Sequence, residues 1–417
     1  MKTITITNVE CILTAPDGMR LIVVKVTTSE PGLTGYGCAT FTQRAYAVKT
    51  AVEAYIKPFA IGRDVDRIED LYQAAYLSSY WRQGPVLNNA LSGLEQALWD
   101  IKGKRAGMPV YQLVGGRVRE AAPVYVHASG DSPEQVAENA QRFIEQGFRY
   151  IRVQMAVAGY STYGSSSVVG LSGESRSISI DPGQKRTWEP TPYVSRTPAL
   201  FEYLRKTLGE EVELLHDVHE RIPAVQALWL ANALEPYRLF FLEDIFAPED
   251  IEYLRMVRAQ CSTPIALGEL FSNQSEYVPL VKDRLIDFIR CHVSTIGGFS
   301  VARKLAAFAE FFGVRTAWHG PGDVSWFGHA ANLHLDLVAP NFGIQEFSLW
   351  MHSEKVREVF PVVPEIRDGA LWPTEKPGWG VEIDEAAAKR FPLEAADGDL
   401  NGSWPEVRRW DGTVVRP

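Results

Sequence analysis

The spacing of hydrophobic and polar positions changes character along the chain. Near the start, TITITNVECIL and RLIVVKVTT have the pattern of paired strands, and GLTGYGCAT is expected to turn after them. From about Ala45 to Ala106, apolar residues recur at helical spacing, and NNALSGLEQALWDIKGKRAG ends at a glycine that can stop a helix. These patterns predict an α+β domain over residues 1–118.

From residue 119 to residue 360, apolar runs of strand length alternate with helical segments. This alternation is typical of a parallel sheet covered by helices. Eight such runs occur, namely PVYVHAS, YIRVQMA, VELLHDVH, LFFLEDI, PIALGEL, IDFIRCHVS, RTAWHGP and FGIQEFS. Eight strands with intervening helices indicate an α/β protein with a TIM-type (β/α)₈ barrel. The first domain is then an N-terminal cap on the barrel, and residues 361–417 are expected to return to that cap.

Three acidic residues end consecutive strands of the predicted barrel. Asp217, Glu243 and Glu269 each follow an apolar run, and they are separated by 26 and 26 residues. One β/α unit needs about that many residues. Because the strand ends of a barrel meet at one rim, the three carboxylates should converge, which is hard to explain for solvated loop residues. An all-oxygen site of this kind suits Mg²⁺, and we predict one Mg²⁺ per subunit.

Two histidines lie close to these acids in the predicted barrel. His219 comes two residues after Asp217 and should face the same side of the strand. It could transfer a proton near neutral pH, or it could orient a ligand carboxylate. His319, in AWHGPGD, ends the seventh strand and could act in the site or bond to its own turn. Asp323 could orient His319 or bind a substrate hydroxyl.

The second strand carries an arginine that could activate a tyrosine. Arg152, in IRVQ, would lie in the barrel mouth and could lower the pKa of a nearby tyrosine. Tyr163, in the long Gly- and Ser-rich connection after this strand, is the candidate base, and Tyr160 is its rival. The alternative for Tyr163 is an aromatic residue packed at an interface.

Further polar and aromatic residues could contact a substrate. Arg290 could bind a carboxylate with two hydrogen bonds, or it could pair with one of the metal-binding acids. Glu346 could bind a hydroxyl or close the barrel rim, and His127 ends the first strand. Trp81, in YWRQGP of the first domain, could cover the barrel mouth or pack at the domain interface.

The composition of the chain limits which binding partners and which cellular compartment are expected for the protein. With 46% hydrophobic and 22% charged residues, the 417-residue chain has the composition of an ordinary globular protein. A net charge of −9 argues against binding to nucleic acid or to an anionic membrane, although a bound dication would still admit an anionic substrate. Four cysteines without CxxC spacing, and the lack of a signal peptide or a long apolar run, predict a cytoplasmic protein.

Several longer segments resemble a known family over nearly the whole chain. YWRQGPV, ALWDIKGKRAGMPVYQLVGG, LLHDVH, EPYRLFFLED, HGPGD and NFGIQE look like the enolase superfamily of mandelate racemase and muconate lactonizing enzymes. Within it, the chain is most similar to the mannonate dehydratase family of sugar-acid dehydratases. The resemblance implies a homo-oligomer that converts a small acid sugar to a 2-keto-3-deoxy sugar acid.

The resemblance also implies a role for each candidate residue. Asp217, Glu243 and Glu269 would bind the Mg²⁺ that stabilises an enediolate. Tyr163, assisted by Arg152, would remove the α-proton, and His219 would protonate the departing 3-hydroxyl. The remaining candidates would position the substrate, with His319 counted among the catalytic groups and the substrate contacts being His127, Arg290, Asp323, Glu346 and Trp81.

The chain departs from the mannonate dehydratase pattern at some positions expected near the substrate. Thr42, Pro321 and Trp326 stand where that family has other residues. We therefore expect Mg²⁺-dependent removal of a proton next to a carboxylate, with mannonate, gluconate or a close relative as the substrate. Two alternatives stay open: an acid-sugar epimerase or cycloisomerase of the same superfamily, or a catalytically weak homologue that binds a ligand.

Overall fold

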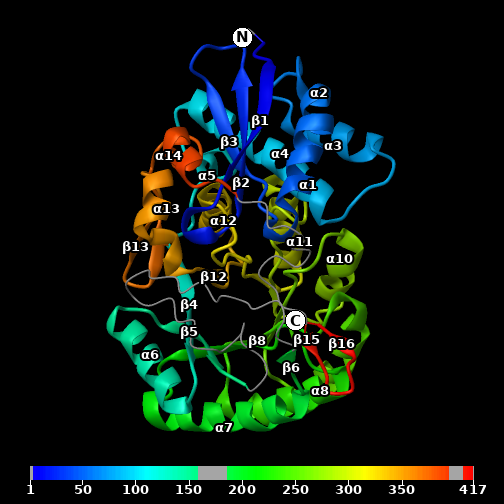
Figure 1. The fold of residues 1–417 in the computed structure, drawn as a ribbon, viewed down its shortest axis with the longest axis vertical. Helices are drawn as coiled ribbons and strands as arrows, with labels where there is room; N and C mark the ends of the chain where they lie inside the picture. The colour runs from blue at the N-terminus through cyan, green and yellow to red at the C-terminus, as the bar shows by residue number, and fades with distance from the viewer. Residues whose placement is uncertain (1–2, 158–185, 394–406, 417) are drawn as a thin grey trace.

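A computed structural model describes residues 3–157, 186–393 and 407–416 (Figure 1). The long connection after the second barrel strand, with Tyr160 and Tyr163, lies outside these residues. The N-terminal part, blue in Figure 1, lies at one end of the molecule, and the barrel lies at the other.

The N-terminal part contains a three-stranded antiparallel sheet in the order β1-β2-β3. Its strands are β1 (Ile6–Thr14), β2 (Leu21–Thr28) and β3 (Thr34–Cys38). The first two were predicted, but the expected turn over GLTGYGCAT was wrong because this segment forms β3. Gly35 and Gly37 lie against helix α4 (Pro85–Ala106), and a Cβ atom on either would come within 2.2 or 2.3 Å of a backbone oxygen of that helix. These glycines permit close packing rather than a turn.

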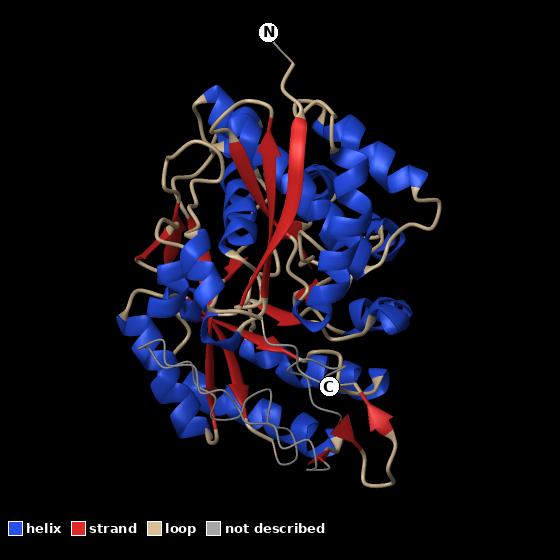
Figure 2. Ribbon diagram, turned by 45° about the horizontal axis from the view of Figure 1, so that its top comes forward, coloured by secondary structure: helices blue, strands red, loops and turns tan. Residues whose placement is uncertain are grey.

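Helices cover the sheet of the N-terminal part (Figure 2). Besides α4 they are α1 (Ala45–Thr50), a wider helical segment Ala51–Ile56, α2 (Lys57–Ala60), α3 (Ile68–Ser78) and α5 (Val110–Leu113). Helix α4 is 22 residues long and buried over most of its length. It ends where Gly107 adopts a left-handed φ of 67°, as glycine does readily.

Eight parallel strands form the barrel, as the sequence predicted. They are β4 (Ala122–Gly130), β5 (Tyr150–Met155), β7 (Glu213–Asp217), β8 (Phe241–Glu243), β9 (Ile265–Leu267), β10 (Phe288–Ile289), β11 (Arg315–Thr316) and β12 (Gln345–Glu346). Each of the first seven pairs with its neighbour in chain order, and β12 pairs with β4. A parallel bridge between Thr316 and Phe342 completes the ring. The predicted (β/α)₈ barrel with an N-terminal domain is confirmed.

Helices surround the barrel, and an apolar layer fills it. The helices are α6 (Pro133–Glu145), α7 (Pro190–Leu208), α8 (Ala224–Leu234), α9 (Leu254–Gln260), α10 (Gln274–Lys282), α11 (Phe299–Phe311), α12 (Trp326–Val338) and α13 (Glu354–Val359). Inside the barrel, buried residues from different strands form one cluster: Tyr125, Leu215, Phe241, Ala266, Phe288, Ala317 and Ile344. This packed layer is the floor beneath the polar strand ends.

The C-terminal segment contacts both parts of the molecule. The hairpin β13 (Glu365–Arg367) and β14 (Ala370–Trp372) extends the sheet beside β4, and α14 (Glu385–Arg390) contacts β1. The last strands, β15 (Val407–Arg408) and β16 (Val414–Val415), form a small sheet with β6 (Arg186–Thr187) near the barrel (Figure 1). Across the ranges that the structure describes, we find no helix with the length and apolar character needed to cross a membrane.

Candidate active site

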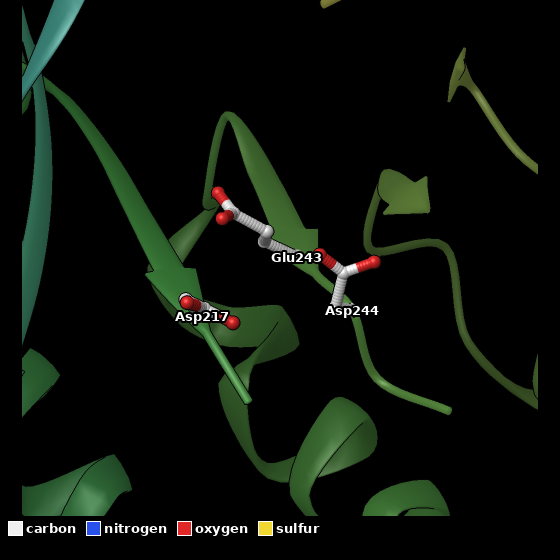
Figure 3. Close-up of side chains that lie close together, drawn as sticks. All are labelled: Asp217, Glu243 and Asp244. Carbon is white, nitrogen blue, oxygen red and sulfur yellow. The ribbon is translucent and has the colours of Figure 1, made fainter. Parts of the chain in front are cut away.

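Two of the predicted acids end adjacent barrel strands and lie together. Asp217 is the last residue of β7 and Glu243 is the last residue of β8, and both are fully buried. Figure 3 shows their side chains with that of Asp244, and the ligand atoms of the three residues lie within 4.8 Å of one another. Asp244 was not among the predicted ligands, because strand alternation would turn its side chain to the opposite side of the strand. Its left-handed φ of 40° breaks that alternation.

Glu269, the third predicted acid, belongs to the same polar cluster but contacts its cationic members. Its carboxylate lies 2.6 Å from Arg290 Nη1, 3.1 Å from His319 Nδ1 and 3.3 Å from His219 Nε2. Asp244, rather than Glu269, therefore stands nearest to Asp217 and Glu243 in this structure. Glu269 connects the acids to the two candidate acid–base histidines.

Arg290 is fully buried and bonds to several of the acids at once. Its Nη2 atom lies 2.5 Å from Glu346 and 2.8 Å from Glu243, and its Nη1 atom lies 3.0 Å from Asp244 as well as close to Glu269. Of the two roles expected for Arg290, the structure shows the ion pair with acids.

Arg152 of β5 approaches the same carboxylates from the other side. Its Nη1 atom lies 2.8 Å from Glu243, 3.2 Å from Asp217 and 3.3 Å from Glu346. Its Nη2 atom lies 3.3 Å from Nδ1 of His127. Arg152 is thus in the barrel mouth, as predicted, while its expected tyrosine partner is outside the described residues.

His219 lies beside the acids and has a strained backbone. The backbone N–H of His219 donates to Asp217 at 2.7 Å, and its φ is 52°, a left-handed value that is uncommon for a residue with a side chain. Burial opposes protonation of this imidazole, but Glu269 and Asp217 raise its pKa above the usual value. The preceding His216 faces away and contacts Tyr193 at 2.6 Å. The ring of His219 instead contacts the acids, with Nε2 beside Glu269.

His319 lies among three carboxylates. Besides Glu269, its ring nitrogens lie 3.6 Å from Asp323 and 3.4 Å from Glu346. Burial works against the charged form, yet Glu269 and Asp323 raise the pKa of His319 to about 10. His319 is therefore an imidazolium at neutral pH, with Asp323 oriented toward it.

Glu346 and His127 complete the cluster on the side of β12 and β4. The two side chains lie 3.1 Å apart, and Glu346 also accepts the backbone N–H of Gly320 at 3.0 Å. Burial and Arg152 lower the pKa of His127 to about 4, so this ring is neutral. Burial favours protonation of Glu346, but Arg290 and His127 hold its pKa well below the usual range.

Trp81 is outside this cluster. Its side chain is 80% exposed, and its ring contacts Tyr80 edge-on at 5.1 Å between centroids. The loop that carries it is held to the barrel by a hydrogen bond between Gln83 and Asn273. Neither covering of the cluster nor burial at the domain interface is seen for this residue.

The cluster as a whole holds more acids than basic partners. Five carboxylates share two arginines and the imidazolium of His319, the acids being Asp217, Glu243, Asp244, Glu269 and Glu346. Burial raises the pKa of Glu243 to about 7, and Asp217 and Glu346 add to the rise while Arg290 and Arg152 oppose it. Buried carboxylates gathered at one place, three of them with ligand atoms within 4.8 Å of one another, are chemically suited to a hard divalent cation.

One buried residue that touches this cluster was missed by the sequence analysis. Tyr125 of β4 lies with its hydroxyl 3.0 Å from Glu243 and 3.2 Å from Nε of Arg290. In the sequence it is an aromatic residue inside an apolar strand, and nothing in the alternation distinguishes it from a packing residue.

Comparisons with known proteins agree with this architecture. The family model of the mandelate racemase / muconate lactonizing enzyme N-terminal domain matches residues 4–115, and the enolase C-terminal domain-like model matches residues 135–387. The D-galactonate dehydratase family member RspA of Pantoea ananatis is 51% identical over 100% of both chains. A D-galactonate dehydratase family member of Enterocloster bolteae is 47% identical, also over 100% of both chains.

Solved structures give the same relationship. The crystal structure of an enolase from Pantoea ananatis with bound D-gluconate and Mg has a TM-score of 0.92 at 50% identity, and the match covers 99% of this chain and 100% of that one. A mandelate racemase/muconate lactonizing enzyme from Sulfitobacter sp. has a TM-score of 0.78 at 26% identity, covering 94% and 97%.

These matches confirm the predicted superfamily, whereas the narrower resemblance to mannonate dehydratases stays a prediction, since the relatives are named for D-galactonate. The predicted enzyme class, a hydro-lyase, agrees with the dehydratase names of the relatives. The chain belongs to the enolase superfamily and, within it, to the D-galactonate dehydratase family.

Proposed function

We propose that this protein is a Mg²⁺-dependent acid-sugar dehydratase that removes the proton next to a carboxylate. The observation that carries the proposal is the buried cluster in which Asp217, Glu243 and Glu269 lie beside the imidazoles of His219 and His319. Its substrate would be a sugar acid such as gluconate, galactonate or mannonate, and its product the corresponding 2-keto-3-deoxy acid.

The donor set fits the proposed cation. Asp217 and Glu243 supply buried carboxylate oxygens, which are the hard ligands that Mg²⁺ prefers. We propose Glu269 as the third ligand because it follows the next strand at the same interval, with Asp244 as its rival. Bound there, Mg²⁺ would stabilise the negative charge that develops on the substrate carboxylate when the α-proton leaves.

The proton at C2 would be taken by Tyr163. A guanidinium near a phenol favours the phenolate, and Arg152 is a buried cation on the strand that precedes the tyrosine in the chain. Tyr163 and its rival Tyr160 both lie outside the described residues, so the choice between them rests on the sequence.

The hydroxyl at C3 would leave as water with a proton from His219. Against the effect of burial, Glu269 and Asp217 raise the pKa of this imidazole above its usual value, which favours the protonated form that a general acid needs. The enol left behind would tautomerise to the 2-keto acid. His319, held between Glu269 and Asp323, is a second cation in the site and would support charge on the substrate or assist this proton transfer.

Substrate hydroxyls and the carboxylate would be positioned by the rest of the cluster. His127 is neutral and can both donate and accept a hydrogen bond, while Glu346 and Asp323 can accept from sugar hydroxyls. Arg290 would act chiefly by neutralising the acids. Trp81 lies outside the cluster, and its proposed contact with the substrate rests on the sequence.

A substrate panel tests this proposal. Four- to six-carbon sugar acids would be incubated with the protein and Mg²⁺, and formation of 2-keto acid would be measured. Turnover of at least one acid, abolished by a chelator and restored by Mg²⁺, is expected. Exchange of the α-hydrogen with deuterated solvent without loss of water would instead indicate an epimerase or cycloisomerase. Thermal stabilisation without any turnover would indicate a homologue that only binds.

A further inference from the structure

Tyr125 joins the apolar floor of the barrel to the polar layer above it. The residue is fully buried on β4, and its ring packs edge-on against Phe241 at 5.8 Å between centroids. Its hydroxyl extends past this layer to Glu243 and Arg290. Because Phe241 lies on the same strand as Glu243, the tyrosine is fixed by the strand whose end it contacts.

The direction of the two hydrogen bonds is set by chemistry. A guanidinium can only donate, so the Tyr125 oxygen accepts from Nε of Arg290 at 3.2 Å. The single phenolic proton is then directed to Oε2 of Glu243 at 3.0 Å. A hydroxyl that accepts from a cation becomes a better donor, so the second bond is strengthened by the first.

The two carboxylate oxygens of Glu243 have different partners. Oε1 contacts Arg152 and Arg290, each at 2.8 Å. For Oε2, the Tyr125 hydroxyl is the hydrogen-bond donor found among the described residues. The terminal torsion of a glutamate is soft, so a carboxylate keeps one orientation only when both oxygens are held.

We propose that Tyr125 is a positioning residue that holds the Glu243 carboxylate in the orientation required to bind the divalent cation. The inference rests on the proposed function, since it concerns the same cation, but it assigns the orientation of a ligand to a residue outside the proposed ligand set. Partners of this kind set metal affinity because a ligand that must be reoriented binds less tightly.

The test compares Tyr125→Phe with a matched variant on the neighbouring strand. Tyr150 of β5 is half-buried and packs against Phe240 at 4.9 Å, and no hydrogen bond of its hydroxyl is found in the described part of the chain. Tyr150→Phe therefore removes a hydroxyl from the barrel without touching Glu243. The dissociation constant for Mg²⁺ alone would be measured by titration calorimetry on the full-length wild type and on both variants.

We expect Tyr125→Phe to weaken Mg²⁺ binding about tenfold or more, and Tyr150→Phe to leave it unchanged. A Mg²⁺ concentration well above the variant's dissociation constant should restore much of the turnover of Tyr125→Phe, because the ligand itself is kept and only its orientation is lost. A purely structural role would lower the melting temperature of Tyr125→Phe while its Mg²⁺ affinity stayed at the wild-type value, and that result would overturn the inference alone. A wild type that binds no Mg²⁺ would overturn the proposed function and this inference with it.

A second measurement covers the case in which Tyr125→Phe does not fold. In crystals of the wild type grown with Mn²⁺, the Tyr125 hydroxyl should lie within hydrogen-bonding distance of one oxygen of Glu243 while the other binds the ion. A Tyr125 hydroxyl turned away from Glu243 in the metal-bound protein would contradict the inference.

Discussion

Buried carboxylates occur at two places in this molecule, and their partners differ. On α4, Glu95 accepts hydrogen bonds from the backbone N–H groups of Phe299 and Ser300 at 2.9 and 2.8 Å, and from the indole of Trp99 at 2.8 Å. It therefore caps the first turn of α11 and fastens the N-terminal part to the barrel. At the barrel mouth, Glu243 instead faces other acids and two shared arginines.

The two glutamates show that a raised pKa does not by itself mark a functional site. Burial raises the pKa of both Glu95 and Glu243 to about 7. The oxygens of Glu95 are occupied by neutral donors that belong to rigid backbone and side chains, so nothing else can bind there. Those of Glu243 are shared within an acidic cluster whose repulsion a divalent cation would relieve. The partners separate a structural acid from a reactive one.

The largest effect should come from the acids at the strand ends. Asp217→Asn or Glu243→Gln removes a ligand charge, and losing several kcal/mol of transition-state stabilisation should lower kcat by about a thousandfold or more. Steady-state kinetics would measure the loss of kcat, and Mg²⁺ titration would measure the accompanying loss of Mg²⁺ affinity. Glu95→Gln is the matched control and should keep the wild-type Mg²⁺ affinity. Full activity in either strand-end variant would show that the substituted acid is not needed to bind the cation, contrary to the comparison with Glu95.

The next effect concerns the proposed base, Tyr163, which would remove a proton without binding the cation. Tyr163→Phe should lower kcat by about 10² to 10⁴, the usual contribution of a general base, with little change in Mg²⁺ affinity. Tyr160→Phe serves as the control. If Tyr160→Phe lost the activity instead, that residue would be the base, and unchanged rates in both would transfer the role to a histidine.

A smaller effect tests the structural glutamate through pH. The pKa of Glu95 is raised in the folded state, so the folded protein binds this proton more tightly than the unfolded chain does. Stability contributed by the proton is thus present near pH 5 and lost as the pH rises to about 7, by at most about 1.4 kcal/mol for each pH unit. Glu95→Gln should remove this dependence. Denaturation at several pH values would measure it, and identical pH profiles for wild type and variant would contradict the assignment.

The smallest expected effect concerns Trp81, a proposed substrate contact that lies outside the polar cluster. Because Trp81 is largely exposed, Trp81→Ala should change the free energy of unfolding by less than about 0.5 kcal/mol. If the side chain contacts the sugar, KM should rise a few-fold while Mg²⁺ affinity is unchanged. An unaltered KM for every acid that is turned over would remove Trp81 from the substrate contacts.

The sequence predicted those parts of the molecule that follow from the spacing of apolar residues and from the order of the strands. Strand-length runs located all eight barrel strands, and equal spacing brought Asp217 and Glu243 together because parallel strands end at one rim. Asp244 was missed because a single left-handed φ redirects its side chain. No local pattern could reveal the cap that Glu95 makes on α11, since its partners are about two hundred residues away.

Two further features could not be predicted from the sequence, because they depend on close packing and on the direction of a side chain. Strand β3 resembled a turn because its glycines make room for α4 rather than for a bend. Tyr125 was indistinguishable from a core aromatic until its hydroxyl was seen beside Glu243. Spacing therefore located the site, while the contacts within it depend on backbone geometry that spacing does not encode.

The central claim is that neighbouring strand-end acids hold one divalent cation. The most direct measurement is the anomalous difference density of crystals soaked in Mn²⁺, a substitute for Mg²⁺ that X-rays can identify. We predict one peak per subunit, with oxygens of Asp217, Glu243 and Glu269 within about 2.0–2.6 Å of it. Bonding to Asp244 in place of Glu269 would exchange the third ligand, and the absence of any peak between Asp217 and Glu243 would contradict the account.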